Sequence, residues 1–271
     1  MTKLPNVSSR LNVHPNLKDR FAAHVLEWRG TVAATHSPPG FKVEVHNRPP
    51  GQQVPACTKC PLCKTRKQVV LFRGYLPCDV LFVGEAPGPS EDHDGYPFVG
   101  PAGEKLNALL ALAWQDAAPL PSSPEEEPPA FHPASAGFTN VVACMPRNPP
   151  EWEWSEDLQR NVPLSTGTIR PPTKEEAAAC APRLHELICM AAPKLIVTLG
   201  QEAKRFLPSG KPIPKRVQSK SGFSSLDPAP DAEVINLLHP SAILRMNDEP
   251  SKQLLAEKRF VLNLSDALRN L

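Results

Sequence analysis

Three segments of the sequence bring residues capable of chemistry to the ends of short apolar runs. The glycine-rich segment 84–101 carries Phe98, Asn140 lies in the segment FTNVVAC, and His239 follows the run EVINLL. An aromatic ring can stack on a flat heterocycle, an amide can read its edge, and a histidine can donate a hydrogen bond to an oxygen that gains negative charge. Each residue alone has an ordinary structural explanation, but the three together predict a pocket for a planar base.

The glycine-rich segment is also acidic, which is unusual for a loop that follows a buried strand and precedes a helix. No Lys-Ser/Thr pair completes a site for a nucleoside triphosphate. The acidic residues of the segment are Glu85, Glu91, Asp92 and Asp94. Carboxylates in such a place can orient water, or can stabilise positive charge on a sugar while a glycosidic bond breaks.

The cysteines indicate a metal site. Cys57 and Cys60 form a Cys-x-x-Cys pair, and a self-contained ferredoxin run would need a further cysteine where the sequence has Lys67. Cys144 follows a predicted strand and Cys180 lies near the start of a predicted helix, so these two can complete a set of four ligands. The spacing does not distinguish zinc from a [4Fe–4S] cluster. The remaining cysteines, Cys63, Cys78 and Cys189, are interpreted as small core residues or spare thiols.

The composition indicates one substantial domain. The 271 residues are 41% apolar and carry a formal net charge of +2. No run is long and apolar enough to span a membrane, and MTKLPNVSSR lacks the apolar core of a signal peptide, so we expect an intracellular protein. The runs 57–78 and 211–220 are basic and contain no acid, which favours a groove that follows nucleic-acid phosphates.

Apolar runs and helical periodicity alternate along the chain. Strands followed by helices predict an α/β fold, a three-layer sandwich with a central, mostly parallel four-stranded sheet. Ligands of such sheets bind beyond the carboxyl ends of the strands, so we expect the site in the loops that follow them. The predicted strands are 79–84, 138–143, 194–199 and 233–238, and the predicted helices are 102–115, 173–190, 200–207 and 250–268.

The first part of the chain does not follow this alternation. We expect residues 1–54 to form an N-terminal extension that is partly helical, with an amphipathic helix over 17–29, and residues 55–271 to form the domain. Proline-rich inserts near 119–135 and 146–172 interrupt the domain. The second insert holds Trp152 and Trp154, which are interpreted as surface packing or as a platform for exposed bases.

Six motifs make the hypothesis more specific. In order, they are CTKCPLCKTRKQVV, VGEAPGPSEDHDGYPFVGPAG, TNVVACMP, PPTKEEAAACAPRL, PKLIVTLG and HPSAILR. They resemble the iron–sulfur uracil-DNA glycosylases of family four, and the resemblance covers roughly residues 55–265. It implies the same α/β fold and a structural [4Fe–4S] cluster, with zinc as the less favoured alternative. The implied ligands are Cys57, Cys60, Cys144 and Cys180.

The resemblance also implies a place for each residue of the base pocket. Phe98 would stack on a flipped uracil, Asn140 would read its polar edge, and His239 would donate a hydrogen bond to the oxygen where charge develops. The backbone lining of the pocket would come from Gly84, Glu85 and Ala86.

The catalytic acid is the point where the resemblance leaves alternatives. Better-known uracil-DNA glycosylases place a water-orienting aspartate two residues after the glycine that corresponds to Gly84, and this sequence has Ala86 there. The acid must come from elsewhere, and Glu85 and Glu91 are the candidates. Gly88 stands where those enzymes have a tyrosine that rejects thymine, so another side chain, with Glu91 as the candidate, must exclude the methyl group.

The segment HPSAILR is expected to act on DNA when the base leaves the stack. Ile243 and Leu244 would serve as apolar wedges, Arg245 would reach a phosphate, and Ser241 would also contact the DNA.

We therefore expect a monofunctional uracil-DNA glycosylase that excises uracil from double- or single-stranded DNA and leaves an abasic site. The alternatives are a uracil-DNA-binding protein with little turnover and a covalent trap. A related branch that traps DNA uses a histidine in its insert, and residues 145–179 contain no histidine. We expect a monomer, cytoplasmic and associated with the nucleoid, whose N-terminal extension is a candidate site for a protein partner.

Overall fold

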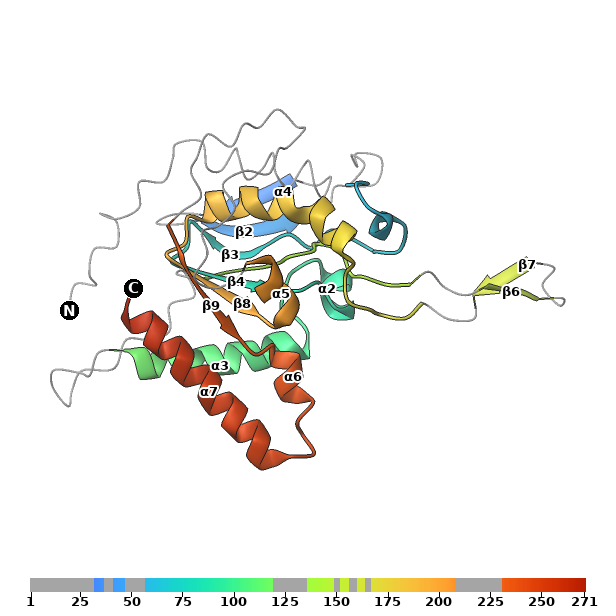
Figure 1. Cartoon of the computed structure of the whole chain (residues 1–271). Helices are drawn as coiled ribbons and strands as arrows, with labels where there is room; N and C mark the ends of the chain where they lie inside the picture. The colour runs from blue at the N-terminus through green and yellow to red at the C-terminus, as the bar shows by residue number, and fades with distance from the viewer. Residues whose placement is uncertain are drawn as a thin grey trace.

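The computed structural model describes residues 57–118, 136–148, 167–207 and 231–271, and the backbone of four further strands. Those strands are β1 (Val32–His36), β2 (Phe41–His46), β6 (Trp152–Ser155) and β7 (Arg160–Pro163). Seven strands form one sheet in the order β1-β2-β3-β5-β4-β8-β9 (Figure 1). β6 and β7 pair with each other as a separate antiparallel ribbon.

Four parallel strands form the centre of the sheet, and they are the four that the apolar runs predict. β4 (Val80–Gly84) lies between β5 (Ala136–Asn140) and β8 (Leu195–Leu199), and β9 (Glu233–Leu237) pairs with β8. Every residue of β4, β5 and β8 is buried, because helices cover both faces of the sheet. The predicted α/β class with a central, mostly parallel sheet is therefore confirmed.

The sheet is larger than predicted, because antiparallel strands extend one edge. β3 (Arg73–Leu76) pairs antiparallel with both β5 and β2, and β1 pairs with β2. The expected N-terminal extension thus contributes two strands to the sheet, and the helix predicted over 17–29 lies outside the described residues. Arg73 and Gly74 interrupt the apolar pattern, which is why the sequence did not indicate β3.

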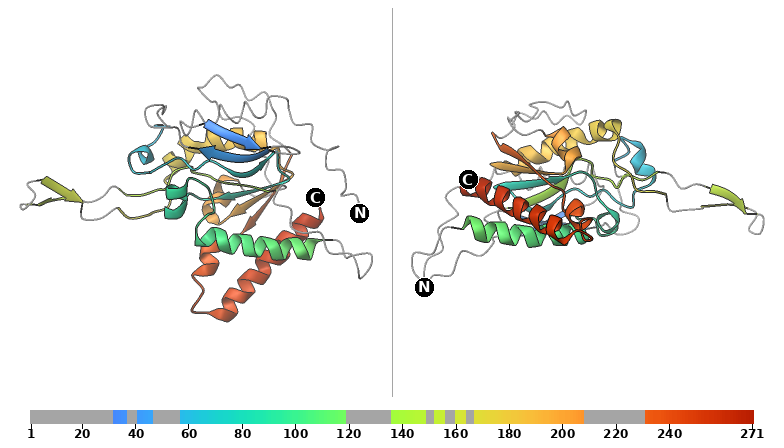
Figure 2. Two further views of the ribbon diagram at one scale, coloured as in Figure 1. Left: turned by 180° about the vertical axis from the view of Figure 1, so that it is seen from behind. Right: turned by 60° about the horizontal axis from the view of Figure 1, so that its bottom comes forward.

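The helices form the two outer layers, with the bounds that periodicity predicts to within a few residues. α4 (Lys174–Ala191) covers one face of the sheet, while α3 (Pro101–Ala117) and α7 (Pro250–Arg269) lie side by side on the other (Figures 1 and 2). The Thr173 hydroxyl accepts a hydrogen bond from the Glu176 N–H, so the predicted capping box begins α4. The shorter helices are η2 (Pro61–Lys64), α2 (Pro89–Asp94), α5 (Gln201–Phe206) and α6 (Pro240–Leu244).

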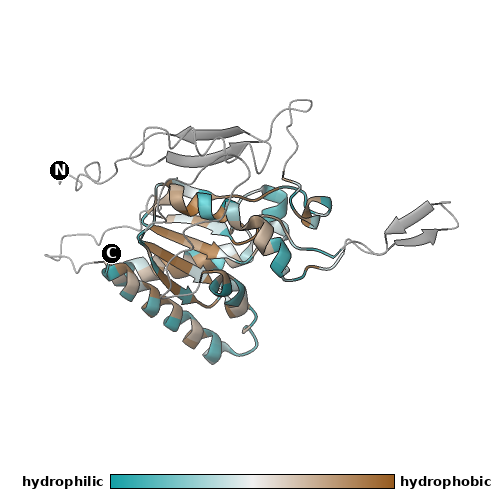
Figure 3. Ribbon diagram, turned by 45° about the horizontal axis from the view of Figure 1, so that its top comes forward, coloured by the Kyte–Doolittle hydropathy of each residue, from teal (hydrophilic) through white to brown (hydrophobic). Residues whose placement is uncertain are grey.

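Alternate residues of the central strands divide the core between the two helical layers. Val80 and Phe82 pack in the cluster shared with α3 and α7, whereas Leu81 and Val83 pack in the cluster shared with α4. Figure 3 shows the apolar strands enclosed by helices whose outer faces are hydrophilic. Among the described residues, no helix is both long and apolar enough to cross a membrane.

The order of the parallel strands fixes where a ligand can bind. The chain leaves β4 through α2 and α3 and returns as β5 on one side, and then α4 leads to β8 on the other side of β4. The loops after β4 and β8 therefore diverge at the carboxyl edge of the sheet. Such a divergence opens the crevice in which α/β proteins bind ligands.

Candidate functional site

Gly84, Phe98 and Asn140 converge at the carboxyl edge of the sheet. Gly84 ends β4 and pairs in register with Asn140, the last residue of β5. A Cβ atom added to Gly84 would lie 2.4 Å from Asn140 Oδ1 and 2.7 Å from Phe98 Cζ. Only glycine leaves room for both side chains at this point. The structure thus brings together the predicted stacking ring and the predicted edge-reading amide.

The backbone holds the Phe98 ring in an uncommon conformation. Phe98 has a φ of 57°, in the left-handed region that residues other than glycine rarely occupy. The first turn of α3 approaches it so closely that a Cβ at Gly103 would lie 1.9 Å from the Phe98 carbonyl oxygen. The ring packs tilted on Phe138, with centroids 6.1 Å apart, and Phe138 stacks on Phe82. Surrounding packing therefore fixes a strained residue at the site.

His239 lies beside Phe98, although the two residues are 141 positions apart in the chain. Their ring centroids are 6.3 Å apart, and the two planes are inclined by 30°. His239 is the N-cap of α6, and its Nδ1 accepts a hydrogen bond of 3.1 Å from the Ser241 N–H. An accepting Nδ1 leaves the proton of the neutral ring on Nε2.

The environment keeps this imidazole neutral. Burial lowers the pKa of His239 to about 4, and the positive charge of Arg245 adds to the decrease. The Ser241 Oγ lies 2.8 Å from Nδ1 and also accepts from the Arg245 guanidinium at 3.5 Å. The result is a neutral ring with its Nε2–H available as a hydrogen-bond donor.

Glu85 follows Gly84 directly and is half-buried. Burial raises the pKa of its carboxyl group, the negative charge of Glu202 raises it further, and the positive charge of Arg205 lowers it. Glu202 and Arg205 belong to α5, the helix that follows β8 across the crevice, and their side chains form an ion pair. Two charges on α5 therefore act in opposite directions on the Glu85 carboxyl.

The carboxylate of Glu91 is bonded to the backbone of its own loop. Its Oε2 accepts from the Gly88 N–H at 3.0 Å, and its Oε1 accepts from the Gly100 N–H at 3.2 Å. The side chain is only 9% exposed. The neighbouring Asp92 is also buried, and it accepts from the Lys67 N–H at 3.0 Å. Much of the acidity of this loop thus serves to hold backbone segments together.

The segment after His239 only partly matches its predicted arrangement. Arg245 is exposed at the end of α6, and Leu244 and Ser241 are half-buried. Ile243 is completely buried and packs in the core with α3 and α7. An apolar wedge must be free to enter the base stack, so the structure leaves Leu244, and not Ile243, in that position.

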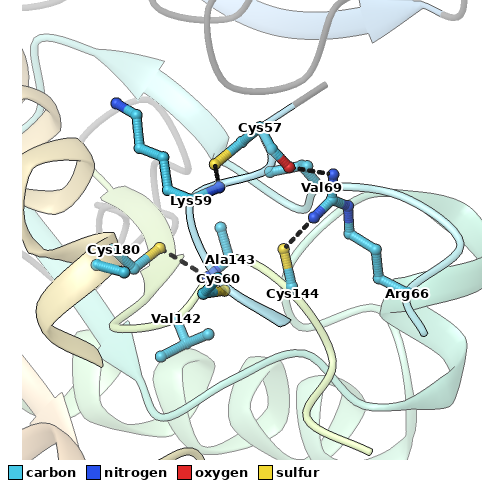
Figure 4. A pocket seen from close by; sticks show the side chains of 10 residues that line it. Cys57, Lys59, Cys60, Arg66, Val69, Val142, Ala143, Cys144 and Cys180 are labelled. Carbon is cyan, nitrogen blue, oxygen red and sulfur yellow. Dashed lines mark hydrogen bonds between the residues drawn. The ribbon is translucent and has the colours of Figure 1, made fainter. Parts of the chain in front are cut away.

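The four predicted cysteine ligands surround one cavity (Figure 4). Cys57 lies just before η2 and Cys60 is the N-cap of this helix. Cys144 follows β5, and Cys180 lies on α4. The apolar part of the cavity wall comes from Val69, Val142, Ala143 and Ala179, and the basic part comes from Lys59 and Arg66. The three other cysteines, Cys63, Cys78 and Cys189, do not line it.

N–H groups are directed at three of the four sulfur atoms. The Lys59 N–H donates to Cys57 Sγ at 3.5 Å, the Ala143 N–H donates to Cys180 Sγ at 3.4 Å, and the Arg66 guanidinium donates to Cys144 Sγ at 3.5 Å. These contacts suit metal-bound thiolates, whose sulfur atoms accept hydrogen bonds.

Burial disfavours ionisation of three of the four cavity thiols. Burial raises the pKa of Cys57 and Cys60, and it raises the pKa of the Cys144 thiol to about 12. Four thiolates would be costly here without compensating positive charge. Among the described residues, no three His, Cys, Asp or Glu side chains converge on a single ion position.

Sequence reasoning missed Arg183, a completely buried residue of α4. Its guanidinium donates to the carbonyl oxygen of Asn140, to that of Val141 at 3.0 Å, and to Thr139 Oγ1 at 3.1 Å. An arginine in an amphipathic helix is normally exposed, so its residue type carries no signal of this contact.

The sequence of this chain matches known proteins over more than half of its length. The family model of the uracil DNA glycosylase superfamily matches residues 74–262. A Type-4 uracil-DNA glycosylase of Thermotoga maritima is 31% identical over 206 residues, which cover 76% of this chain and 87% of that protein. One of Pyrobaculum aerophilum is 31% identical, covering 70% of this chain and 80% of that protein. One of Sulfurisphaera tokodaii is 31% identical, and the match spans 58% of this chain and about half, 55%, of that protein.

Proposed function

The chain belongs to the uracil DNA glycosylase superfamily, and from that premise we propose that it is a monofunctional DNA repair glycosylase that hydrolyses the N-glycosidic bond of deoxyuridine and leaves an abasic site. The observation that carries this proposal is the approach of the Phe98 and Asn140 side chains to Gly84 at the end of β4, with the His239 ring centroid 6.3 Å from that of Phe98. The matched relatives of Thermotoga maritima and Pyrobaculum aerophilum, named as Type-4 uracil-DNA glycosylases, support it.

Recognition of the base rests on Phe98 and Asn140. The Phe98 ring offers its face to a base rotated out of the duplex. The Asn140 amide can accept from the N3–H of uracil and donate to the adjacent carbonyl oxygen. Cytosine presents an amino group and an unprotonated nitrogen at the same positions, so it cannot pair with the amide in the orientation that uracil requires.

His239 stabilises the leaving base. As the bond from sugar to base breaks, the negative charge moves onto the pyrimidine oxygens. The Nε2–H of a neutral histidine donates to one of them, and that hydrogen bond strengthens as the charge develops. No proton transfer is required, which agrees with the low pKa of this imidazole.

Glu85 is our choice for the catalytic carboxylate. It stands next to Gly84 at the crevice. Both carboxylate oxygens of Glu91 accept backbone hydrogen bonds, whereas those of Glu85 are not occupied in this way within the described structure. An ionised Glu85 can orient the attacking water and stabilise positive charge on the sugar. Glu91 then acts as a positioning residue, which holds the loop between Gly88 and Gly100 around Phe98.

We further propose that Cys57, Cys60, Cys144 and Cys180 hold a [4Fe–4S] cluster. When bound, the cluster supplies a cross-link among η2, β5 and α4 rather than redox chemistry. The hydrogen bonds to three sulfur atoms and the spread of the four thiols around one cavity support it.

The DNA contacts follow from the ends of the same loops. Leu244 fills the space that the flipped base leaves, and Arg245 and Ser241 contact the backbone beside it. The substrate is uracil-containing DNA, double- or single-stranded, and the protein acts as a monomer in the cytoplasm, near the nucleoid. Residues 1–54 remain the candidate site for a protein partner.

One assay tests the proposed function. Oligonucleotides with a single uracil, opposite guanine or adenine or in a single strand, are incubated with the protein and analysed on denaturing gels with and without alkali treatment. Cleavage after alkali alone, with no retarded adduct, is the expected result. A denaturant-stable adduct would instead indicate covalent capture, and binding without alkali-labile product would indicate a uracil-DNA-binding protein.

A further inference from the structure

We propose that the cysteine cavity and the base pocket are coupled through two buried charged side chains, Asp92 and Arg183, so that a filled cluster site and a bound uracil stabilise each other. The proposal rests on the proposed function, because it takes uracil as the ligand of the pocket and a cluster as the ligand of the cysteines. Each link joins a segment that carries cysteine ligands to a segment that carries a base-contacting residue.

Asp92 forms the first link. It joins the cysteine segment, residues 57–71, to the Phe98 loop, residues 84–101. Both carboxylate oxygens accept from the Lys67 N–H, at 3.0 and 3.1 Å, and Oδ1 also lies 3.4 Å from the Gln68 nitrogen. Lys67 and Gln68 continue the segment that begins with Cys57. The Gln68 amide also donates to the His93 carbonyl oxygen. Asp92 is 2% exposed, so loss of these hydrogen bonds would leave buried polar groups without partners.

Through its position on α2, Asp92 connects these hydrogen bonds to the loop that carries the Phe98 ring. It lies on α2 next to Glu91, whose two carboxylate oxygens hold Gly88 and Gly100 on either side of Phe98. A shift of the cysteine segment would therefore move α2, and with it the loop that keeps Phe98 in its strained conformation.

Arg183 forms the second link, between α4 and the end of β5. Cys180 lies three residues earlier, on the same side of the helix, and its Sγ accepts from the Ala143 N–H. The Arg183 guanidinium donates to the Asn140 and Val141 carbonyl oxygens. Asn140 is the predicted reader of the base, and the backbone that positions its amide is thus held from α4.

A third contact closes the arrangement. Thr139 Oγ1, which accepts from Arg183, donates to the Leu71 carbonyl oxygen at 2.7 Å. The Val70 N–H donates to the Ala143 carbonyl oxygen at 2.7 Å. The end of the cysteine segment is therefore bonded to Thr139 and Ala143, on either side of Asn140 in the chain.

Coupling of this kind is reciprocal. If the filled cysteine site favours the arrangement of Phe98 and Asn140 that binds uracil, then uracil must favour the filled site by the same factor. Asp92 and Arg183 could instead stabilise the fold in general, without coupling the two sites. In that case, the loss of the cluster would not depend on whether uracil is bound in the base pocket.

The experiment follows the loss of visible absorbance from anaerobically purified full-length protein after addition of an iron chelator. Free uracil is compared with free cytosine and with no base. Cluster loss requires the cysteine site to open, and coupling makes that opening less frequent when uracil is bound. We therefore expect saturating uracil to slow the loss by about fivefold or more, in line with the lower end of the affinity coupling usual between protein sites, and we expect cytosine to have no effect. An identical rate under all three conditions in the wild-type protein would overturn the proposal.

Two variants and two controls locate the coupling. Asp92→Asn and Arg183→Met each remove one link, and we expect the rate of cluster loss to depend less on uracil in each. Asp94→Asn and Arg259→Met change exposed residues of the same types and should keep the full dependence. Full uracil dependence in both link variants would also overturn the proposal. If a link variant does not fold, the wild-type comparison still decides.

The same preparations are assayed on uracil-containing DNA. A wild-type protein that excises uracil but shows no protection of the cluster contradicts the coupling alone. A wild-type protein that fails to excise uracil contradicts the proposed function.

Discussion

The Phe98 ring and the His239 imidazole lie with their centroids 6.3 Å apart and their planes inclined by 30°. The two residues come from loops that follow different strands, and Phe98 also closely approaches Gly84, where the Asn140 amide lies. An aromatic ring, an amide and a neutral imidazole thus lie near one another at one end of the sheet. This arrangement supports the proposed binding of a single pyrimidine.

Gly84→Ala tests that convergence. The added methyl group would lie 2.4 Å from Asn140 Oδ1 and 2.7 Å from Phe98 Cζ, so it must displace the amide, the ring or both. A misplacement of about 1 Å at a reacting site can cost about 100-fold in rate. We expect a loss of that size in kcat/KM on uracil-containing DNA, with affinity for undamaged DNA unchanged. Activity within a few-fold of wild type would argue against a pocket at this glycine.

His239→Ala should lower kcat much more than it lowers DNA affinity, because the proposed hydrogen bond strengthens as the base departs. Removing one such donor typically costs about 100- to 1,000-fold in kcat. Single-turnover rates and binding of DNA with a non-cleavable uracil nucleotide give the two quantities separately. Equal losses in both would contradict the proposed role.

The pH dependence of stability provides a separate test of the His239 environment. The folded pKa of about 4 lies below the ordinary value of 6.5, so the unfolded chain binds more protons between these pH values. The contribution of His239 to stability is therefore complete above pH 6.5 and is lost as the pH falls towards 4. Urea unfolding of wild type and His239→Asn across this range should show a steeper decrease for the wild type.

Glu85 should control the acid limb of the activity profile. Its carboxyl must be ionised to act, and its pKa is raised, so wild-type kcat should fall at a pH above the usual range of a glutamate. Glu85→Gln should lose about 100- to 10,000-fold and show no acid limb of this origin. Glu202→Gln should move the limb to lower pH and Arg205→Gln to higher pH, because these neighbours act on the Glu85 pKa in opposite directions. A limb that does not respond to either change would assign it to another group.

The sequence predicted the parts of the structure whose signals are local. Apolar runs indicated all four parallel strands, and the signal is clearest for β4 and β8, which are buried along their whole length and are therefore rich in apolar residues. Phe98 and His239 were identifiable because they follow such runs, and Asn140 because it belongs to one, so that all three were expected near the carboxyl edge of the sheet. β3 was missed, because Arg73 and Gly74 interrupt its apolar pattern and its pairing with β2 and β5 depends on tertiary structure. The contacts of Arg183 depend on tertiary packing alone.

The acidic loop shows the same division between local and tertiary signals. Its carboxylates were readable as chemical groups, but their division of labour was not. The backbone N–H groups that Glu91 and Asp92 accept from belong to segments up to 25 residues away in the chain. Burial of Ile243 likewise depends on α3 and α7, so the sequence could not separate it from Leu244 as a wedge.

Glu91→Gln distinguishes a positioning residue from a catalytic one. A glutamine offers one oxygen, so either the Gly88 or the Gly100 N–H would face an amide NH₂ and lose its acceptor. An unsatisfied buried donor costs about 1–3 kcal/mol, which urea unfolding should detect. We expect kcat to fall while the acid limb stays at the wild-type pH. Loss of that limb would instead make Glu91 the catalytic acid.

The metal content of the protein tests the cysteine site directly. Anaerobically purified wild type should be brown, with broad absorption in the near-visible region and about four iron atoms per chain. Cys144→Ser and Cys180→Ser should lose colour and thermal stability together, because these ligands join β5 and α4 to the segment of Cys57. Cys63→Ser and Cys189→Ser should keep the colour, since neither residue lines the cavity. A colourless wild type with one zinc per chain would refute the cluster and leave the four ligands in place, whereas colour that survives Cys180→Ser would refute the ligand set itself.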